Sequence, residues 1–272
     1  MNKYKKERNI KIDKYWIWLS LIKNIKTIKK IELLQIYKEP NKIWNASFNE
    51  LKNTNILKEA EVKNILESKN EKQILQHYQY IVENNIKLIN IQDKRYPQIL
   101  KEIYTPPILI YLRGNDEILN NKNIAIVGCR EASNYGCKVA YNIAKELSKN
   151  NINIISGLAR GIDSKAHLGS VMVKSEGKTI AVLGNGLDTI YPSENIELAR
   201  MILKNGGAII SEYPIGSKPE KQHFPARNRI ISGISKGVIV VEAKKKSGTL
   251  ITVDFALEQG RDVYCVPRKY KF

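Results

Sequence analysis

The sequence predicts an α/β protein with a doubly wound, mostly parallel sheet that is preceded by a small all-helical N-terminal domain. From residue 123 onward, short apolar runs alternate with segments whose apolar residues recur at helical spacing, as in parallel sheets covered by helices. Residues 1–85 show the helical pattern instead. The chain of 272 residues is 43% hydrophobic and can fill a core in both parts. We therefore expect a helical domain at residues 1–85 and a sheet domain at residues 86–272.

The helical domain is predicted from its helix-start signals. Ser47 is followed three residues later by Glu50, the spacing of a capping box. Asn70 precedes a segment with apolar residues at helical intervals, namely Ile74, Leu75, Tyr78, Ile81 and Val82. The many lysines of this domain are better explained by a solvated face than by a second nucleic-acid surface.

The sheet domain begins with two strand-like runs, Ile86–Ile91 and Ile108–Leu112, which we expect to extend one edge of the sheet. Strands and helices then alternate, as in a doubly wound sheet. The expected strands are Ile124–Gly128, Ile152–Ser156, Thr179–Leu183, Ala208–Ser211, Val238–Glu242 and Val263–Val266. The expected helices are Tyr135–Leu147, one that ends near Val173, Asn195–Leu203, Phe224–Ile234 and Leu250–Gln259.

The stretch Asn123–Gly136 joins the first of these alternating strands to its helix through a glycine-containing turn. Amides at such a turn lie at the positive end of the helix dipole, so the turn can hold a phosphate. Arg130 lies inside the turn and can add a cation. In the alternative interpretation, Gly128 only allows close packing of strand and helix, and Arg130 is a solvated charge. The turn alone does not separate the two.

Glycines, hydroxyls and cations also follow the other strands. Ligands of such sheets bind beyond the carboxyl ends of the strands, so we expect these residues to converge on an extended anion. The candidate binding residues are Gly128, Arg130, Ser133, Gly157, Lys221, Phe224, Arg227, Asn228, Arg229, Lys246, Ser247, Gly248 and Thr249. Phe224 either stacks on a base or anchors its helix in the core. The loop after the second strand also contains Arg160.

The chain is strongly basic, with 45 Lys and Arg against 27 Asp and Glu and a formal net charge of +18. This excess favours a polyanionic partner, although the wealth of Lys, Asn and Ile also fits an AT-rich genome. The cysteines Cys129, Cys137 and Cys265 have no paired spacing, so neither a disulfide framework nor a zinc site is indicated. We expect a cytoplasmic protein without a metal or cofactor. The apolar run Tyr15–Ile22 is too short to span a membrane.

Catalysis is weakly supported by the sequence. Asp163 and His167 are one helical turn apart and could form an acid–base pair, but no third group is evident, which favours a polar contact under the glycine-rich turn. A dinucleotide site is not expected. The first turn reads GCREASNYG rather than GxGxxG, and the second strand ends in Ser156 and Gly157 instead of an acidic residue.

Five long motifs occur in order along the chain. They are GCREASNYG, SGLARGIDSKAH, TIAVLGNGLDTIYPSEN, SEYP followed by FPARNRIISGIS, and VVEAKKKSGTLITVDFALEQGRDVYCVP. Over about residues 90–267 the sequence resembles the bacterial DNA-processing protein A family, also called DprA or Smf. The resemblance implies an extended Rossmann-like core without known catalysis. It also implies that the protein binds single-stranded DNA, forms homodimers and loads the recombinase RecA during natural transformation.

The resemblance assigns roles to the candidate residues. Arg130 and Ser133 match first-loop positions that grip the DNA backbone. The family's basic and stacking segment is matched by Lys221, Phe224, Arg227, Asn228 and Arg229.

The chain departs from the family pattern in two places. Leu21–Tyr37 lacks the Gly-bearing hairpin of many members, and Arg268 stands where the family has Gly after its VP. We expect the helical domain to be of the SAM-like type. We also expect the last part of the core, and the winged helix of longer members, to be missing from these 272 residues.

The alternative function is that of a nucleotide-binding or nucleoside-monophosphate-cleaving protein on the same core. Phosphoribohydrolases of the lysine-decarboxylase-like family place PGGxGT and a catalytic Glu at the corresponding late turn. Here that turn reads KKKSGTLITVD, with lysines in place of the paired glycines and Asp254 in an uncertain register. The sequence therefore favours DNA binding over nucleotide cleavage.

Overall fold

The computed structural model describes residues 13–244 and 247–267, which form two compact units. The first unit takes in the chain up to Ile91 together with Tyr104–Ile110, and the second takes in Gln92–Ile103 and the residues from Tyr111 onward. The boundary expected from sequence, after residue 85, lies just before strand β1 (Lys87–Asn90). Across the two described ranges, no helix is both long enough and apolar enough to cross a membrane.

Short helices build the first unit. Residues 13–21 are helical, and they are followed by α2 (Thr27–Tyr37), α3 (Pro40–Asn45), α4 (Phe48–Asn53), α5 (Glu59–Glu67) and α6 (Glu71–Glu83). The predicted capping box is confirmed, because the Ser47 amide donates to the Glu50 carboxylate at 2.8 Å and the Glu50 amide donates to Ser47 Oγ at 3.3 Å. Asn70 likewise caps α6 by accepting from the amide of Gln73 at 3.1 Å.

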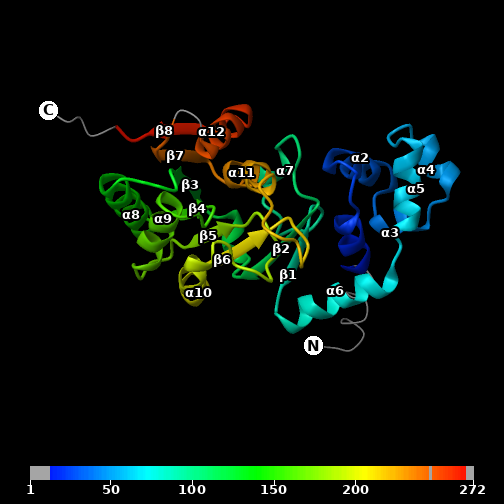
Figure 1. Ribbon diagram of the computed structural model, residues 1–272, viewed down its shortest axis with the longest axis horizontal. Coiled ribbons are helices and arrows are strands. Elements are labelled where there is room, and N and C mark those ends of the chain that lie inside the picture. The colour runs from blue at the N-terminus through cyan, green and yellow to red at the C-terminus, as the bar shows by residue number, and fades with distance from the viewer. Residues whose placement is uncertain (1–12, 245–246, 268–272) are drawn as a thin grey trace. The chain divides into compact units, whose positions relative to one another are not determined.

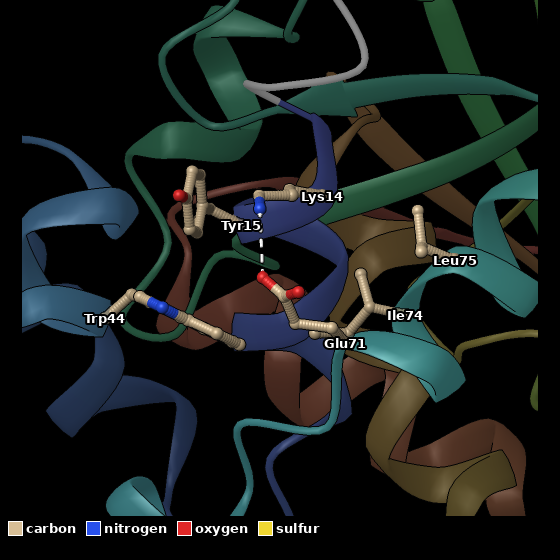
Figure 2. Close-up of a pocket in the computed structure, with 6 residues that line it drawn as sticks. All are labelled: Lys14, Tyr15, Trp44, Glu71, Ile74 and Leu75. Carbon is tan, nitrogen blue, oxygen red and sulfur yellow. Dashed lines mark hydrogen bonds and ion pairs between the residues drawn. The ribbon is translucent and has the colours of Figure 1, made fainter.

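Aromatic residues fill the centre of the first unit. Trp18 is buried and its indole donates to the Ser68 hydroxyl at 2.9 Å, while Trp44 packs edge-on against Trp18 and Tyr15. Figure 2 shows a pocket beside these rings, in which Lys14 Nζ pairs with the Glu71 carboxylate at 3.3 Å. The pocket is lined by Lys14, Tyr15, Trp44, Glu71, Ile74 and Leu75.

The apolar stripe predicted for α6 is narrower than expected. Ile74 and Ile81 are buried, whereas Leu75 and Val82 are 52% and 45% exposed. Residues seven apart lie on the same side of a helix, and each next residue is rotated by about 100° away from that side. The stripe therefore follows Ile74 and Ile81, with the half-buried Tyr78 between them.

The sheet is mixed and mostly parallel, as the sequence predicts. Its strand order is β1-β2-β6-β5-β4-β3-β7-β8. Along β3, Ile124 pairs in parallel with Ile154 of β4 and with Gly237 of β7, whereas β2 runs antiparallel to β6 with Tyr111 opposite Ser211. After β1, the strands are β2 (Leu109–Gly114), β3 (Asn123–Gly128), β4 (Asn153–Ser156), β5 (Thr179–Val182), β6 (Ala208–Ser211), β7 (Gly237–Glu242) and β8 (Asp262–Cys265).

Helices cover both faces of this sheet. The helices α8, α9 and α10 lie on one face, and α11 and α12 lie on the other (Figure 1). Their bounds are α7 (Gln98–Lys101), α8 (Asn134–Lys149), α9 (Ile162–Val171), α10 (Ile196–Lys204), α11 (His223–Gly233) and α12 (Gly248–Glu258), with short 3-10 turns η1 (Glu117–Asn120) and η2 (Ser193–Asn195). The doubly wound arrangement is therefore confirmed.

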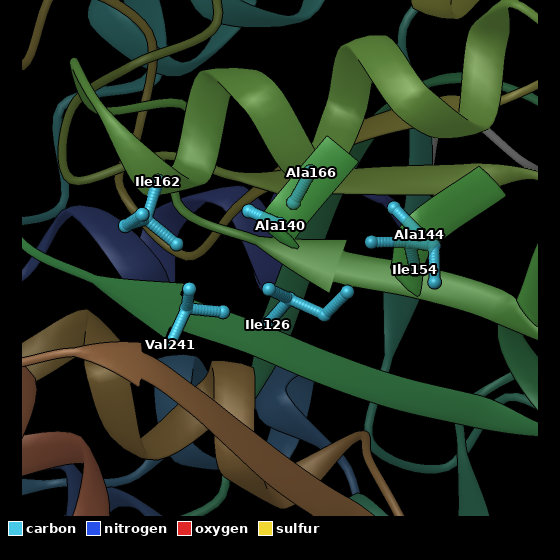
Figure 3. Packing of buried hydrophobic residues seen from close by; sticks show 7 residues of the cluster. All are labelled: Ile126, Ala140, Ala144, Ile154, Ile162, Ala166 and Val241. Atoms are coloured by element: carbon cyan, nitrogen blue, oxygen red, sulfur yellow. The ribbon is translucent and has the colours of Figure 1, made fainter. Parts of the chain in front are cut away.

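The core under α8 and α9 is built from small and branched residues (Figure 3). Ile126 of β3 and Ile154 of β4 are fully buried against Ala140 and Ala144 of α8 and Ala166 of α9. Alanines on the helices allow close approach to the sheet, which fills the interior densely. This packing fixes the points at which β3 and β4 end, and so it positions the loops that follow them.

Candidate functional site

A hollow lies at the carboxyl ends of β3, β4 and β5. The loop after each of these strands contributes to it, together with the first turns of α11. Its lining residues are Arg130, Gly157, Ala159, Arg160, Tyr191, Pro192, Phe224 and Arg227. This is the edge of the sheet at which the sequence predicts an anion site, and it brings together four of the candidate residues: Arg130, Gly157, Phe224 and Arg227.

An aromatic pair and a cation form the open part of the hollow. The guanidinium carbon of Arg130 lies 5.6 Å from the centroid of the Phe224 ring, within the range of a cation–π contact. The ring of Tyr191, a residue that is 43% exposed, lies 5.5 Å from that of Phe224 and is tilted by 38°. Flat rings can stack on a planar base, and a guanidinium beside them can hold the phosphate attached to that base.

Arg227 forms the floor of the hollow rather than its surface. The residue is only 4% exposed, and its Nη1 donates to the carbonyl of Val182 at 2.8 Å. Its guanidinium packs on the bare backbone of Gly157, where an added Cβ would meet Nη1 at 1.8 Å. Burial lowers the pKa of Arg227 to about 10, an effect that Asp163 opposes and Arg130 reinforces. Arg227 nevertheless stays charged at neutral pH.

The buried partner of this charge is Asp163, at the start of α9. Its carboxylate accepts from the amides of Gly157 at 3.1 Å and Ala159 at 3.4 Å. Burial raises the pKa of Asp163, and the positive charge of Arg227 acts in the opposite direction. The carboxylate therefore holds the turn after β4 in place and balances the charge beneath the hollow.

His167 lies one helical turn further along α9 and is fully buried. Its Nδ1 lies 2.7 Å from Thr179 Oγ1, whose hydroxyl donates to the carbonyl of Ile154, so Nδ1 carries the proton. Burial, and then the charge of Arg227, lower the pKa of His167 to about 3. Asp163 and His167 thus make the internal polar contacts that the sequence favours for them.

Two further candidates on α11 are directed into the protein. The guanidinium of Arg229 forms a two-point ion pair with Glu212, in which Nη2 lies 2.6 Å from Oε2. The side-chain amide of Asn228 donates from its Nδ2 to the carbonyl of Gly248 at 3.1 Å. Arg229 and Asn228 are 8% and 9% exposed, so these side chains fasten α11 to its neighbours.

The structure of the first turn agrees in part with each of the two interpretations that the sequence left open, close packing at Gly128 and a cation at Arg130. Gly128 permits close packing, because an added Cβ would meet Ile162 Cγ1 at 2.5 Å. Arg130 is nevertheless exposed and reaches the hollow. The turn is tied to both neighbouring loops, since the Cys129 amide donates to the Glu242 carbonyl at 2.8 Å and the Ile162 amide donates to the Cys129 carbonyl at 3.2 Å.

The remaining candidates lie outside the hollow. Ser133 is exposed and caps α8, accepting from the amide of Gly136 at 3.1 Å. Lys221 is exposed just before α11. In the loop after β7, Gly248 is exposed and Thr249 is buried, with Ser247 at the cap position of α12. Lys246 lies outside the described residues.

Four lining residues were absent from the candidate set drawn from the sequence, and two of them, Tyr191 and Arg160, carry side chains suited to DNA. Tyr191 follows the glycine-rich turn after β5 in the motif NGLDTIYPSEN, and an aromatic residue there was the available signal. Arg160 was noted in its loop but not selected. Its Nε donates to the Glu194 carboxylate at 2.9 Å, so its charge is partly balanced.

The fold and this hollow define a Rossmann-like α/β protein with a cationic, ring-lined rim at the carboxyl ends of its strands. The profile of the DNA recombination-mediator protein A family matches residues 87–272. The chain belongs to this family.

Named relatives agree with this assignment. The chain is 47% identical to DNA processing protein DprA of Bacillus subtilis strain 168 over 186 residues, which cover 68% of this chain and 62% of the relative. It is 37% identical to Protein Smf of Synechocystis over 257 residues, which cover 93% of this chain and 64% of the relative. The chain thus spans somewhat under two-thirds of the length of these relatives.

Solved structures show the same fold. The X-ray structure of DprA from Streptococcus pneumoniae matches with a TM-score of 0.80 at 33% identity and covers 94% of this chain and 87% of that one. DNA processing protein A from Helicobacter pylori, whose structure describes a single-stranded DNA binding mode, matches with a TM-score of 0.61 at 29% identity. That match covers 68% of this chain and 81% of that one.

Proposed function

We propose that this protein binds single-stranded DNA at the hollow and delivers the strand to the recombinase RecA in transformation and recombination. The observation that carries the proposal is the position of Arg130 over the ring of Phe224, at 5.6 Å. Proteins that bind single strands without sequence preference combine a cation for the backbone with a ring for the bases. The single-stranded DNA binding described for the Helicobacter pylori protein supports the proposal.

The residues of the rim divide into contacts and supports. Arg130 and the exposed Lys221 hold phosphates, and Phe224 with Tyr191 stacks on a base. Arg227 supports the floor of the hollow, because its guanidinium already donates to the Val182 carbonyl and interacts with the charge of Asp163. The loop after β7, with the exposed Gly248, extends the surface for the strand.

We propose a binding protein without catalytic activity, which acts as a homodimer in the cytoplasm. The strongest acid–base candidates do not support a reaction at the hollow. The Asp163 carboxylate accepts hydrogen bonds from two backbone amides, and His167 donates a hydrogen bond to Thr179 in the interior of the protein. The residue considered for nucleotide cleavage, Asp254, is exposed on α12.

Fluorescence anisotropy with labelled oligo-dT and a duplex of equal length, at two salt concentrations, tests the DNA proposal. We expect preference for the single strand, because the hollow presents rings and cations and few groups suited to base edges. Arg130→Ala should weaken binding by about 1–3 kcal/mol and lower the salt slope by about 0.7, the share of one phosphate contact. The matched control is Lys72→Ala, an exposed cation of α6. Equal losses in both variants would show that net charge alone binds the strand.

The RecA step has a separate test. The protein should speed the assembly of RecA on oligonucleotides coated with single-strand-binding protein, and Arg130→Ala should reduce this effect in proportion to its loss of affinity. Intact DNA binding without any stimulation would restrict the function to DNA binding.

A further inference from the structure

The start of α8 is the place where a doubly wound sheet usually binds a phosphate. This helix has 16 residues and follows β3 through the turn that carries Arg130. Its first amides have no partner within the helix and lie at the positive end of the dipole, so they attract anions. In this protein a side chain of the neighbouring strand already accepts a hydrogen bond at this position.

That side chain is Glu242, the last residue of β7. Its Oε2 accepts from the amide of Ser133 at 2.9 Å and from the hydroxyl of Ser133 at 3.2 Å. The same hydroxyl oxygen accepts from the amide of Gly136 at 3.1 Å. The carboxylate therefore takes the place that a phosphate oxygen takes at other helix starts.

The backbone around Glu242 is shaped for this contact. An added Cβ at Gly136 would lie 2.4 Å from Glu242 Oε2, so a side chain at this position would push the carboxylate away. The strand end is held too, because the Glu242 carbonyl accepts from the Cys129 amide at 2.8 Å. Glu242 is thus fixed by its backbone and by its side chain at once.

We propose that Glu242 determines where the protein accepts phosphate, by closing the start of α8 with a negative charge supplied by the protein itself. A phosphate that approached these amides would have to displace the carboxylate or lie against a like charge within a few Å, which is unfavourable. The DNA backbone is directed instead to the side chain of Arg130, on the hollow side of the same turn. This inference rests on the proposed function for the direction taken by the strand, but the closure itself concerns only Glu242 and α8.

Amide chemical shifts in the ¹⁵N-labelled full chain measure the closure directly. Inorganic phosphate, titrated at constant ionic strength, should leave the signals of Ser133 and Gly136 unchanged in the wild type. In Glu242→Gln, which keeps the shape and an acceptor but loses the charge, both signals should shift and saturate. Glu242→Ala, which vacates the position, should respond at lower phosphate concentrations. Saturating shifts of Ser133 and Gly136 in the wild type would overturn the proposal, whether or not either variant folds.

Oligo-dT binding supplies the second readout. Removing the charge of Glu242 should tighten binding roughly two- to fivefold and steepen the salt slope by about 0.7, because one more phosphate contact becomes available. The matched control is Glu131→Gln in the same turn, whose carboxylate pairs with Lys244 at 2.7 Å at the surface. An equal gain in Glu131→Gln, or weaker binding in Glu242→Gln, would overturn the steering role.

The two proposals fail in different ways. If neither the wild type nor any variant bound oligo-dT, while phosphate shifted Ser133 and Gly136 only in the Glu242 variants, the DNA proposal would fall and the closure would stand. If Arg130→Ala abolished binding and the Glu242 variants behaved as the wild type in both assays, the DNA proposal would stand and the closure would fall.

Discussion

Gly157 and Arg227 share a space that holds only one side chain. The guanidinium of Arg227 lies where a Cβ of residue 157 would project, and its Nη1, the atom nearest to that Cβ, donates to the Val182 carbonyl. A buried arginine at this depth is tolerable because Asp163 balances its charge and the Val182 carbonyl accepts a hydrogen bond from its Nη1. The shape of the hollow therefore depends on the absence of a side chain at Gly157.

Gly157→Ala should lower the free energy of unfolding by about 1–3 kcal/mol, because Arg227 must move in a closely packed region. Oligo-dT binding should weaken with it, since the floor of the hollow shifts. Urea denaturation and anisotropy measure the two effects. Gly248→Ala is the control for the stability measurement, because an added Cβ there meets nothing within 4 Å. Equal destabilisation by both substitutions would show that the contact with Arg227 does not matter.

The sequence predicts the positions of some residues of the site and not those of others. Arg130 and Phe224 were predicted correctly as neighbours at one edge, because a cation after one strand and a ring after another converge there in any doubly wound sheet. The burial of Arg227, Asn228 and Arg229 could not be predicted, because it depends on Asp163, Glu212 and Gly248, which are distant in sequence. A basic helix start has the same pattern whether its cations point outward or inward.

Among the elements, α11 shows how polar anchors orient a helix. Ile230, Ile231 and Ile234 bury its apolar side, while Arg229 and Asn228 fasten it to Glu212 and Gly248. These bonds set the position of Phe224 in the first turn of the helix. The stacking ring is thus placed by contacts further along α11.

Glu212→Gln should destabilise the protein by about 3–5 kcal/mol, because the buried guanidinium of Arg229 loses its counter-charge. The pKa of Arg229 supports the coupling: burial lowers it, but Glu212 raises it above the usual value. Chemical denaturation measures the loss. In the double variant Arg229→Met with Glu212→Met, the loss should be smaller.

The same pair separates structure from DNA contact. In Arg229→Met the salt slope of oligo-dT binding should stay unchanged, provided that the variant is folded. A decrease by about 0.7 would show that Arg229 holds a phosphate itself.

Strands were predicted well where both of their faces are buried. The apolar runs of β3 to β7 correspond to the observed strands within a residue or two, because strands covered on both faces must be apolar along their length. The antiparallel pairing of β2 with β6 could not be predicted from the apolar run at Ile108–Leu112, since the direction of a strand leaves no periodic signal. The stripe of α6 was too wide at Leu75 and Val82 for a similar reason: periodicity alone does not define the edge of the buried face.

For the whole molecule, the buried His167 links global stability to pH. Its pKa of about 3 in the folded protein lies below the ordinary value near 6.5, so the unfolded chain binds a proton that the folded chain refuses. The stability contributed by the neutral ring is complete above about pH 6.5 and is lost as the pH falls toward 3. Asp163 acts in the opposite direction, because its raised pKa favours the folded state as the carboxylate becomes protonated.

Because of His167, the free energy of unfolding of the wild type should fall by up to about 1.4 kcal/mol per pH unit as the pH is lowered from 6.5 to 3. The comparison with His167→Gln isolates this contribution, because Asp163 is present in both proteins. The variant should be less stable at neutral pH and show a flatter dependence in this interval. Urea titrations at half-unit pH steps provide the measurement, and parallel curves for the two proteins would contradict the assignment.

The backbone bonds that tie the first turn to its neighbours have a consequence for motion. The Cys129 amide donates to the Glu242 carbonyl and the Cys129 carbonyl accepts from the Ile162 amide, so backbone bonds join the end of β7, the turn after β3 and the start of α9, which follows the loop after β4. Opening one of these loops breaks a bond of the next, which makes the three loops one cooperative unit. The amide protons of Cys129 and Ile162 therefore exchange with solvent through a shared opening event, and the segments that carry Arg130 and Arg160 become accessible together.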